Sequence, residues 1–140
     1  MPDSVNFHFD IDGDNFTSAG EASVMIKKLL RQMEFKPDVI RRVSVAMYEG
    51  EINMVIHANG GTADVDVFCD RIEITLRDNG PGISNIDLAM QEGYSTAPDN
   101  IRSLGFGAGM GLPNMKKYTD GMRIESEVGR GTTIYMTVNT

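Results

Sequence analysis

The sequence has 140 residues, enough for one domain with its own hydrophobic core, and its hydrophobic (41%) and charged (24%) fractions are ordinary for a globular protein. Thirteen basic and twenty acidic residues give a net charge of −7, which argues against nucleic acid as the main partner. There is no apolar run near the length of a membrane span (about 20 residues) and no signal-peptide pattern, and a single cysteine suits a reducing compartment. We therefore expect a single cytoplasmic domain over residues 1–140 that binds neither nucleic acid nor membrane.

The first two elements are predicted to be a strand and a helix. Apolar residues alternate with polar ones over residues 5–11, which is typical of a half-buried strand. Ser18 and Glu21 then have the spacing of a capping box, and apolar residues follow at helical intervals. Two of these, Met25 and Met33, are predicted to fill the core.

A second helix is predicted over residues 37–58, with an unusual polar stripe beside its apolar one. Glu49, Asn53 and His57 are each four residues apart, so they lie on one face of the helix. From the residues alone, this stripe is either part of a site or a solvated helix face.

Two neighbours of the stripe carry separate predictions. Gly50 costs about 1 kcal/mol in a helix interior, which indicates that another element packs closely against it. Glu51 lies about 200° around the helix from Glu49 and is expected to point elsewhere.

An antiparallel hairpin is predicted next, from alternating apolar residues over 63–69 and 72–76. Cys69 falls in the apolar phase and is predicted to be a small core residue. The second strand ends at Asp78, which is followed by a turn sequence up to Gly82; a carboxylate here is either a ligand or a turn former. A short helix over residues 86–92 is predicted after it.

Residues 94–103 have no clear period, and together with the glycines that follow they make a connection whose length indicates a lid or binding loop. Glycines alternate from Gly105 to Gly111 and run into a helix predicted over residues 112–119. Such a helix N-terminus favours anions, so the segment either cradles phosphate or is a flexible surface loop. It has neither the P-loop spacing nor the position of a dinucleotide fingerprint. Two final strands are predicted over residues 122–127 and 132–138.

Four blocks appear in a fixed order: Glu49 to Asn53, Asp78 to Gly82, Gly105 to Gly111, and Gly129 to Thr132. Together they resemble the ATPase superfamily shared by gyrase, histidine kinases and mismatch-repair proteins. They match its N box (E-x-x-x-N), its D-x-G-x-G box, its lid glycines and its G-x-G-T box. The resemblance covers nearly the whole chain. Within the superfamily, the short length and the run from Gly109 to Lys117 are most similar to small bacterial anti-sigma-factor serine/threonine kinases and stress-pathway switch kinases.

The resemblance implies an α/β two-layer sandwich, in which helices cover one face of a mixed, largely antiparallel sheet (the histidine kinase-like ATPase, or Bergerat, fold) and an ATP lid spans about residues 94–110. It also implies a Mg²⁺- and ATP-binding protein serine/threonine kinase. Its partner would be a small regulatory protein, either an anti-sigma-factor antagonist or a sigma factor, and the kinase itself would be a possible homodimer. The alternatives are a non-catalytic ATP-gated binding protein and a detached histidine-kinase-like catalytic domain.

The family's catalytic and base-binding roles fall on residues of three blocks. Glu49 would be the general base for the attacking hydroxyl, and Asn53 would offer its amide oxygen to Mg²⁺. Asp78 would accept a hydrogen bond from the adenine amino group, with Gly80 and Gly82 letting the backbone pass close to the base. Thr132 would complete the adenine pocket.

The phosphate-binding roles fall on the lid and the helix that follows it. The resemblance implies that backbone N–H groups of Gly107, Gly109, Met110 and Gly111 would contact the phosphates. Arg102, Lys116 and Lys117 are candidates for the positive charge that an acidic protein needs beside a polyphosphate, or are solvated surface residues.

Overall fold

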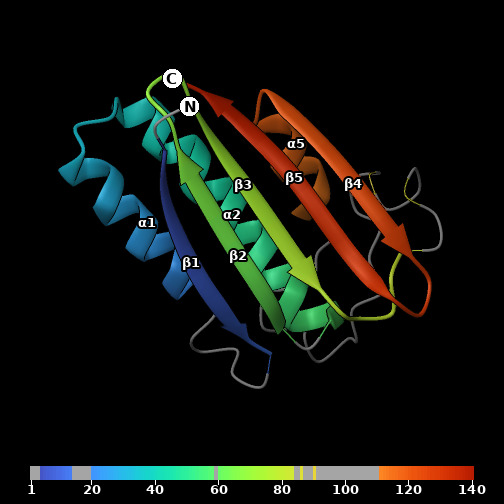
Figure 1. Ribbon diagram of the computed structural model, residues 1–140. Helices are drawn as coiled ribbons and strands as arrows, with labels where there is room; N and C mark the ends of the chain where they lie inside the picture. The colour runs from blue at the N-terminus through green and yellow to red at the C-terminus, as the bar shows by residue number, and fades with distance from the viewer. Residues whose placement is uncertain (1–3, 14–19, 59, 84–85, 87–89, 91–110) are drawn as a thin grey trace.

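The computed structural model describes residues 4–13, 20–58, 60–83, 86, 90 and 111–140. In these ranges the chain forms five strands and three helices (Figure 1). In chain order the elements are β1 (Val5–Asp12), α1 (Glu21–Gln32), α2 (Pro37–Ala58), β2 (Gly60–Val67), β3 (Arg71–Asp78), α5 (Gly111–Lys117), β4 (Gly121–Glu127) and β5 (Gly131–Asn139). The predicted lid, and the helix predicted over residues 86–92 apart from Ile86 and Met90, lie outside the described residues.

The strands form one sheet in the order β1-β2-β3-β5-β4, and all four neighbouring pairs are antiparallel. The sheet was expected to be mixed and largely antiparallel; among the described strands there is no parallel pair. The helices lie together on one face, as Figure 1 shows from the open side of the sheet. α2 crosses under most of the strands, with α1 and α5 packed on either side of it. The predicted two-layer α/β architecture is confirmed. None of the described helices has the length and apolar character needed to cross a membrane.

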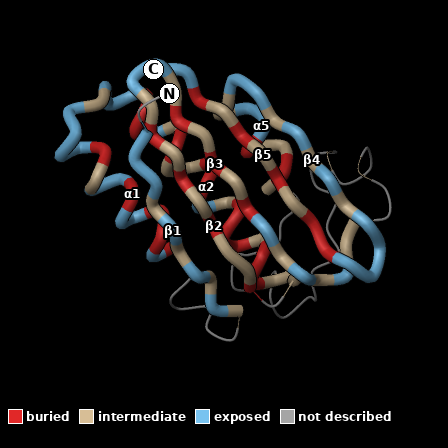
Figure 2. Tube along the Cα trace, in the orientation of Figure 1, coloured by how far each residue is buried: buried red, intermediate tan, exposed pale blue. Residues whose placement is uncertain are grey.

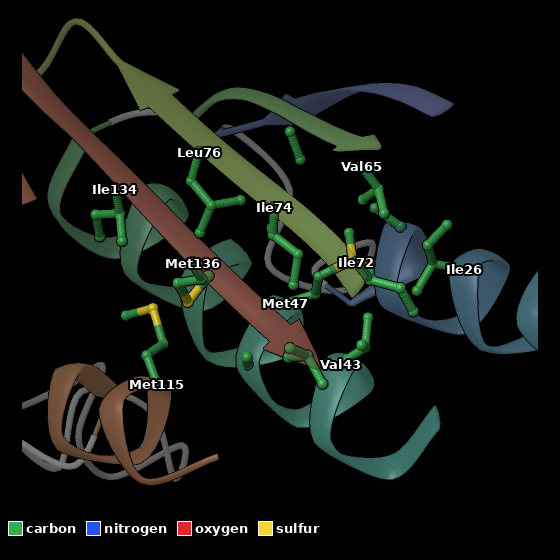
Figure 3. Close-up of a cluster of buried hydrophobic side chains, with 14 of the residues drawn as sticks. Ile26, Val43, Met47, Val65, Ile72, Ile74, Leu76, Met115, Ile134 and Met136 are labelled. Carbon is green, nitrogen blue, oxygen red and sulfur yellow. The ribbon is translucent and has the colours of Figure 1, made fainter. Parts of the chain in front are cut away.

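The core lies between α2 and the sheet (Figures 2 and 3). Val43 and Met47 of α2 face Ile72 and Ile74 of β3, and all four are almost fully buried. Gly50 is the point of closest approach, because a Cβ at this position would overlap Cδ1 of Leu76. The closely packed neighbour that was predicted from Gly50 is therefore Leu76, the third apolar residue of β3.

The predicted apolar face of α1 is partly wrong. Its buried residues are Ala22, Ser23, Ile26 and Leu30, whereas Met25 is 48% exposed and Met33, just after the helix, is 40% exposed. α1 packs mainly on α2 and also contacts the edge strand β1, and only a narrow stripe of the helix is buried. The N-cap position is Gly20, with φ 99°, rather than the predicted Ser18, which lies outside the described residues.

Cys69 was predicted to be a core residue, and this prediction is wrong. Strand β2 ends at Val67, so Cys69 lies in the turn that leads into β3 and is exposed. The alternation of apolar residues continues in the sequence for two residues beyond the strand that it describes.

Candidate functional site

The polar stripe of α2 meets the start of α5. Glu49 and Asn53 are half-buried on the same face of α2. Gly111, the first residue of α5, lies against the Asn53 amide: a Cβ at Gly111 would be 2.8 Å from both Oδ1 and Nδ2. One turn further along α5, Nδ2 of Asn114 donates a hydrogen bond of 3.4 Å to Oε1 of Glu49. Two residues predicted for catalysis and metal binding are thus held beside the end of the glycine-rich segment.

Asp78 lies at the end of β3, opposite Thr132 of β5 in the antiparallel register. Its Oδ1 accepts two backbone hydrogen bonds, from the N–H of Gly80 (2.9 Å) and the N–H of Thr132 (3.2 Å). Both bonds end on the same oxygen, so within the described part of the chain Oδ2 keeps its capacity to accept a hydrogen bond from a ligand. A carboxylate oriented in this way can accept a hydrogen bond from an amino group of a ligand.

The turn after Asp78 is fixed to α2 and to the β4–β5 hairpin. A Cβ at Gly80 would lie 2.6 Å from that of Ala58, so only glycine fits between the turn and the end of α2. Gly82 has φ 79°, which favours glycine. The Pro81 carbonyl accepts a hydrogen bond of 2.9 Å from the Gly129 N–H in the hairpin turn. The D-x-G-x-G and G-x-G-T blocks are therefore in direct contact.

Sequence reasoning missed Ser126, which lies between these two blocks. Its Oγ accepts a hydrogen bond of 2.7 Å from the Ile83 N–H and lies 2.8 Å from Oγ1 of Thr132. Its position in the strand could have indicated this role. Every second residue of β4 is partly buried, and these residues are Met122, Ile124 and Ser126, so the serine occupies a position where an apolar residue is expected. A polar residue in a buried phase of a strand usually has hydrogen-bonding partners.

His57 lies on the same α2 face, close enough to Asp78 for the carboxylate to affect its charge. Burial lowers the pKa of His57, and the negative charge of Asp78 opposes that shift. The net direction favours a neutral imidazole near neutral pH.

The predicted site residues thus fall into two connected groups. Glu49, Asn53 and Gly111 form one at the α2–α5 contact, and Asp78, Gly80 and Thr132 form the other at the end of β3. The Gly80–Ala58 contact joins the second group to the C-terminal end of α2.

The predicted basic residues are not part of these contacts. Lys116 and Lys117 are exposed, and Nζ of Lys117 is 5.7 Å from the centroid of the Tyr118 ring. Arg102, Gly107, Gly109 and Met110 lie outside the described residues.

Residues 38–140 match the model of the family described as histidine kinase-, DNA gyrase B-, and HSP90-like ATPases. The chain belongs to this family. The match contains both groups of site residues, α2 without its first residue, and every described element after α2.

Several relatives of similar length are anti-sigma F factors. The chain is 30% identical to the one from Priestia megaterium and 31% identical to the one from Geobacillus thermodenitrificans; each alignment covers 97% of this chain and 92% of the relative. The Clostridium acetobutylicum protein is 33% identical over 82% of this chain and 80% of its own. The protein is therefore an anti-sigma F factor-like member of the family.

Solved structures confirm the fold. A Mycobacterium tuberculosis protein with RsbU and RsbW domains has a TM-score of 0.64 at 15% identity, covering 96% of this chain and 31% of that one. The mycobacterial sensor histidine kinase MprB has a TM-score of 0.55 at 16% identity, over 96% and 97% of the two chains. The histidine kinase-like ATPase fold is thus shared with proteins of low sequence similarity.

The residues present fit a purine nucleotide with a magnesium ion. The Asp78 carboxylate has an acceptor oxygen left over, and the close Asn53–Gly111 contact puts an amide oxygen beside a helix start. Among the described residues no three His, Cys, Asp or Glu side chains gather into a metal site. An ion held by Asn53 would therefore take further ligands from phosphate oxygens and water, as is usual for Mg²⁺.

Proposed function

We propose that the protein is an ATP- and Mg²⁺-dependent serine/threonine kinase that acts on a small regulatory protein in the bacterial cytoplasm. The observation that carries the proposal is the Glu49–Asn53 pair, present on one face of α2 and flanked by Gly111 and Asn114 of α5. The similarity to anti-sigma F factors supports a partner of the sigma-factor or anti-sigma-factor-antagonist kind.

In this proposal Asp78 binds the adenine amino group through Oδ2, while Gly80 and Gly82 allow the backbone to approach the base. Thr132 completes the pocket through its hydroxyl. Asn53 holds Mg²⁺, whose chemistry is to neutralise charge on the phosphates. The N–H groups of Gly107, Gly109, Met110 and Gly111, with Arg102 of the lid over about residues 94–110, bind the phosphates.

Glu49 acts on the partner's serine or threonine hydroxyl. Its carboxylate orients the hydroxyl and takes its proton as the oxygen bonds to the γ-phosphorus. The bond from that phosphorus to the β,γ-bridging oxygen breaks, and ADP is released with its electron pair. Lys116 and Lys117 are exposed on α5 and contribute long-range positive charge rather than direct contacts.

The first experiment is calorimetry of ATP binding with Mg²⁺, on the wild type and on Asp78→Asn. The asparagine keeps one oxygen for the Gly80 and Thr132 N–H groups but places a donor where an acceptor is needed. We expect ATP affinity to fall about a hundredfold while the fold is retained. A wild type that does not bind ATP would overturn the proposal.

The second experiment separates the kinase from the alternatives. With labelled ATP and a candidate partner, transfer is expected for the wild type and not for Glu49→Ala. An ATP-gated binder would keep its regulation in Glu49→Ala. A histidine-kinase-like domain would give acid-labile phosphohistidine instead of phosphoserine.

The homodimer, for which we propose β1 and α1 as the contact, is tested by light scattering.

A further inference from the structure

The Ser126 hydroxyl connects the two sides of the proposed base pocket. Besides the Ile83 N–H at 2.7 Å and Oγ1 of Thr132 at 2.8 Å, it lies 3.2 Å from the Gly131 carbonyl oxygen. The three partners come from the turn after β3 and from the start of β5, while Ser126 itself is on β4.

The chemistry of the partners favours one direction for these hydrogen bonds. A hydroxyl has one proton to donate and two lone pairs to accept with. The Ile83 N–H can only donate, and the Gly131 carbonyl can only accept. Ser126 therefore satisfies all three partners in one arrangement: it accepts from Ile83 and from the Thr132 hydroxyl, and it donates to Gly131.

The reverse arrangement makes one hydrogen bond fewer. If Ser126 donated its proton to Thr132, the Gly131 carbonyl would lose its hydroxyl donor and one lone pair of Ser126 would be unused. Thr132 is buried (7% exposed), and unmade hydrogen bonds at buried positions are costly. The first arrangement is the more stable one.

This arrangement decides what Thr132 can offer a ligand. Its proton is used on Ser126, so its Oγ1 can only accept. Its backbone N–H is already donated to Oδ1 of Asp78, whose Oδ2 is also an acceptor. A base that meets Oδ2 and Oγ1 meets two acceptors, which match the 6-amino group of adenine and repel the 6-oxo group of guanine.

We propose that Ser126 is a positioning residue that makes the pocket selective for adenine, by holding the Thr132 hydroxyl as an acceptor and the Ile83 turn in place. The inference rests on the proposed nucleotide-binding function and adds its specificity. Ser126 acts through Thr132 and the turn rather than by touching the base.

The test is calorimetric affinity for ATP and for GTP, both with Mg²⁺, on the wild type and Ser126→Ala. Loss of the serine frees the Thr132 proton, which can then be donated to guanine. We expect the ratio of ATP to GTP affinity to fall about tenfold or more, because the freed hydroxyl is no longer held as an acceptor for adenine and can donate to guanine. Ser126→Thr keeps a hydroxyl and should keep the wild-type ratio, which would show that the hydroxyl at this position sets the selectivity.

Two further variants complete the design. Ser126→Cys fills the position with a slightly larger side chain that is a much weaker hydrogen-bonding group, so it should lower the ratio even if the alanine variant fails to fold. Ser44→Ala is the matched control, because it removes a half-buried hydroxyl that donates to the Ile40 carbonyl on α2, and its ratio should not change.

The outcomes distinguish this inference from the function on which it rests. Selective ATP binding by the wild type with an unchanged ratio in Ser126→Ala and Ser126→Cys would overturn the inference and leave the proposed function standing. A wild type that binds neither nucleotide would overturn both.

Discussion

Asn114 donates a hydrogen bond from Nδ2 to Oε1 of Glu49 and so joins α5 to the polar face of α2. Both side chains are half-buried, which limits the positions that the Glu49 carboxylate can take. The glycine-rich segment runs directly into α5. The orientation of the proposed general base therefore depends on the helix that follows the segment proposed to bind phosphate.

Replacing Asn114 tests this relationship. In Asn114→Ala we expect phosphoryl transfer to slow about tenfold, because the base is less well oriented, with ATP affinity changed less than about twofold. Asn6→Ala is the control, since it also removes an amide bound to a carboxylate (Asp66), but on the open face of the sheet. Equal effects of the two variants on transfer, measured with labelled ATP, would contradict the prediction.

Gly111→Ala should damage the proposed metal site. The new Cβ would lie 2.8 Å from the Asn53 amide atoms, so the amide has to move. We expect Mg²⁺-dependent ATP affinity to fall about tenfold or more with little change in melting temperature. Gly121→Ala is the matched control, because its Cβ would have only an ordinary contact, 3.8 Å from Cβ of Thr137. Calorimetry on both variants with and without Mg²⁺ makes the comparison.

Gly50→Ala tests the tightest contact between α2 and the sheet. Alanine improves helix propensity by about 1 kcal/mol, but overpacking a core costs about 1–3 kcal/mol. Since the Cβ would overlap Leu76, we expect a net loss of about 1 kcal/mol of unfolding free energy in urea. Leu76→Val removes the overlapping Cδ1 atom. The double variant Gly50→Ala, Leu76→Val should therefore lose less stability than the sum of the losses in the two single variants.

Glu51 faces away from the site and caps α1. Glu51 is only 1% exposed, and its carboxylate accepts hydrogen bonds from the N–H groups of Gly20, Ala22 and Ser23. Burial raises its pKa, and these donors oppose the shift. In Glu51→Gln one oxygen becomes a donor facing other donors, so we expect a loss of about 2–3 kcal/mol in chemical denaturation. Glu49→Gln makes the same chemical change on the other face and should cost stability little.

The pH dependence of stability should carry opposite contributions from the two histidines. Because the pKa of His57 is lowered, the unfolded chain binds more protons in the interval below the ordinary histidine pKa of 6.5, and the stability linked to His57 is lost as the pH falls through that interval. Hydrogen bonding to Asp64, then to Asp10, raises the pKa of His8, so its stabilisation is present at low pH and is lost as the pH rises.

Thermal melts between about pH 7 and pH 5 test both signs. His57→Gln should reduce the loss of stability on acidification. His8→Gln should increase that loss, by a smaller amount because His8 is exposed and its ion pairs are screened. Changes of the same sign in both variants would contradict the assignment.

Much of the fold followed from local patterns in the sequence. The 22 residues of α2 were predicted with their correct ends, because Pro37 begins the helix and the glycines after Ala58 end it. Spacing by four placed Glu49 and Asn53 on one face, and the ordered motifs paired Asp78 with Thr132.

The rest depended on contacts between residues far apart in the chain. Nothing near Glu51 indicates that it caps a helix that begins about 30 residues earlier, and Ser126 is defined by partners on other strands. Met25 is exposed because no described element packs on that side of α1, and periodicity alone does not predict which side of a helix is covered. The roles of all the site residues stay predictions, and Arg102, Gly107, Gly109 and Met110 also lie outside the described residues.

Helix α2 carries Glu49 and Glu51 on opposite sides, and each is held by a different neighbour. A roll of α2 about its own axis that moved Glu49 off Asn114 would at the same time withdraw Glu51 from the three N–H groups of α1. The rotation of α2 about its axis therefore determines both the position of the proposed general base and the hydrogen bonds that anchor α1. Neither can be adjusted without the other.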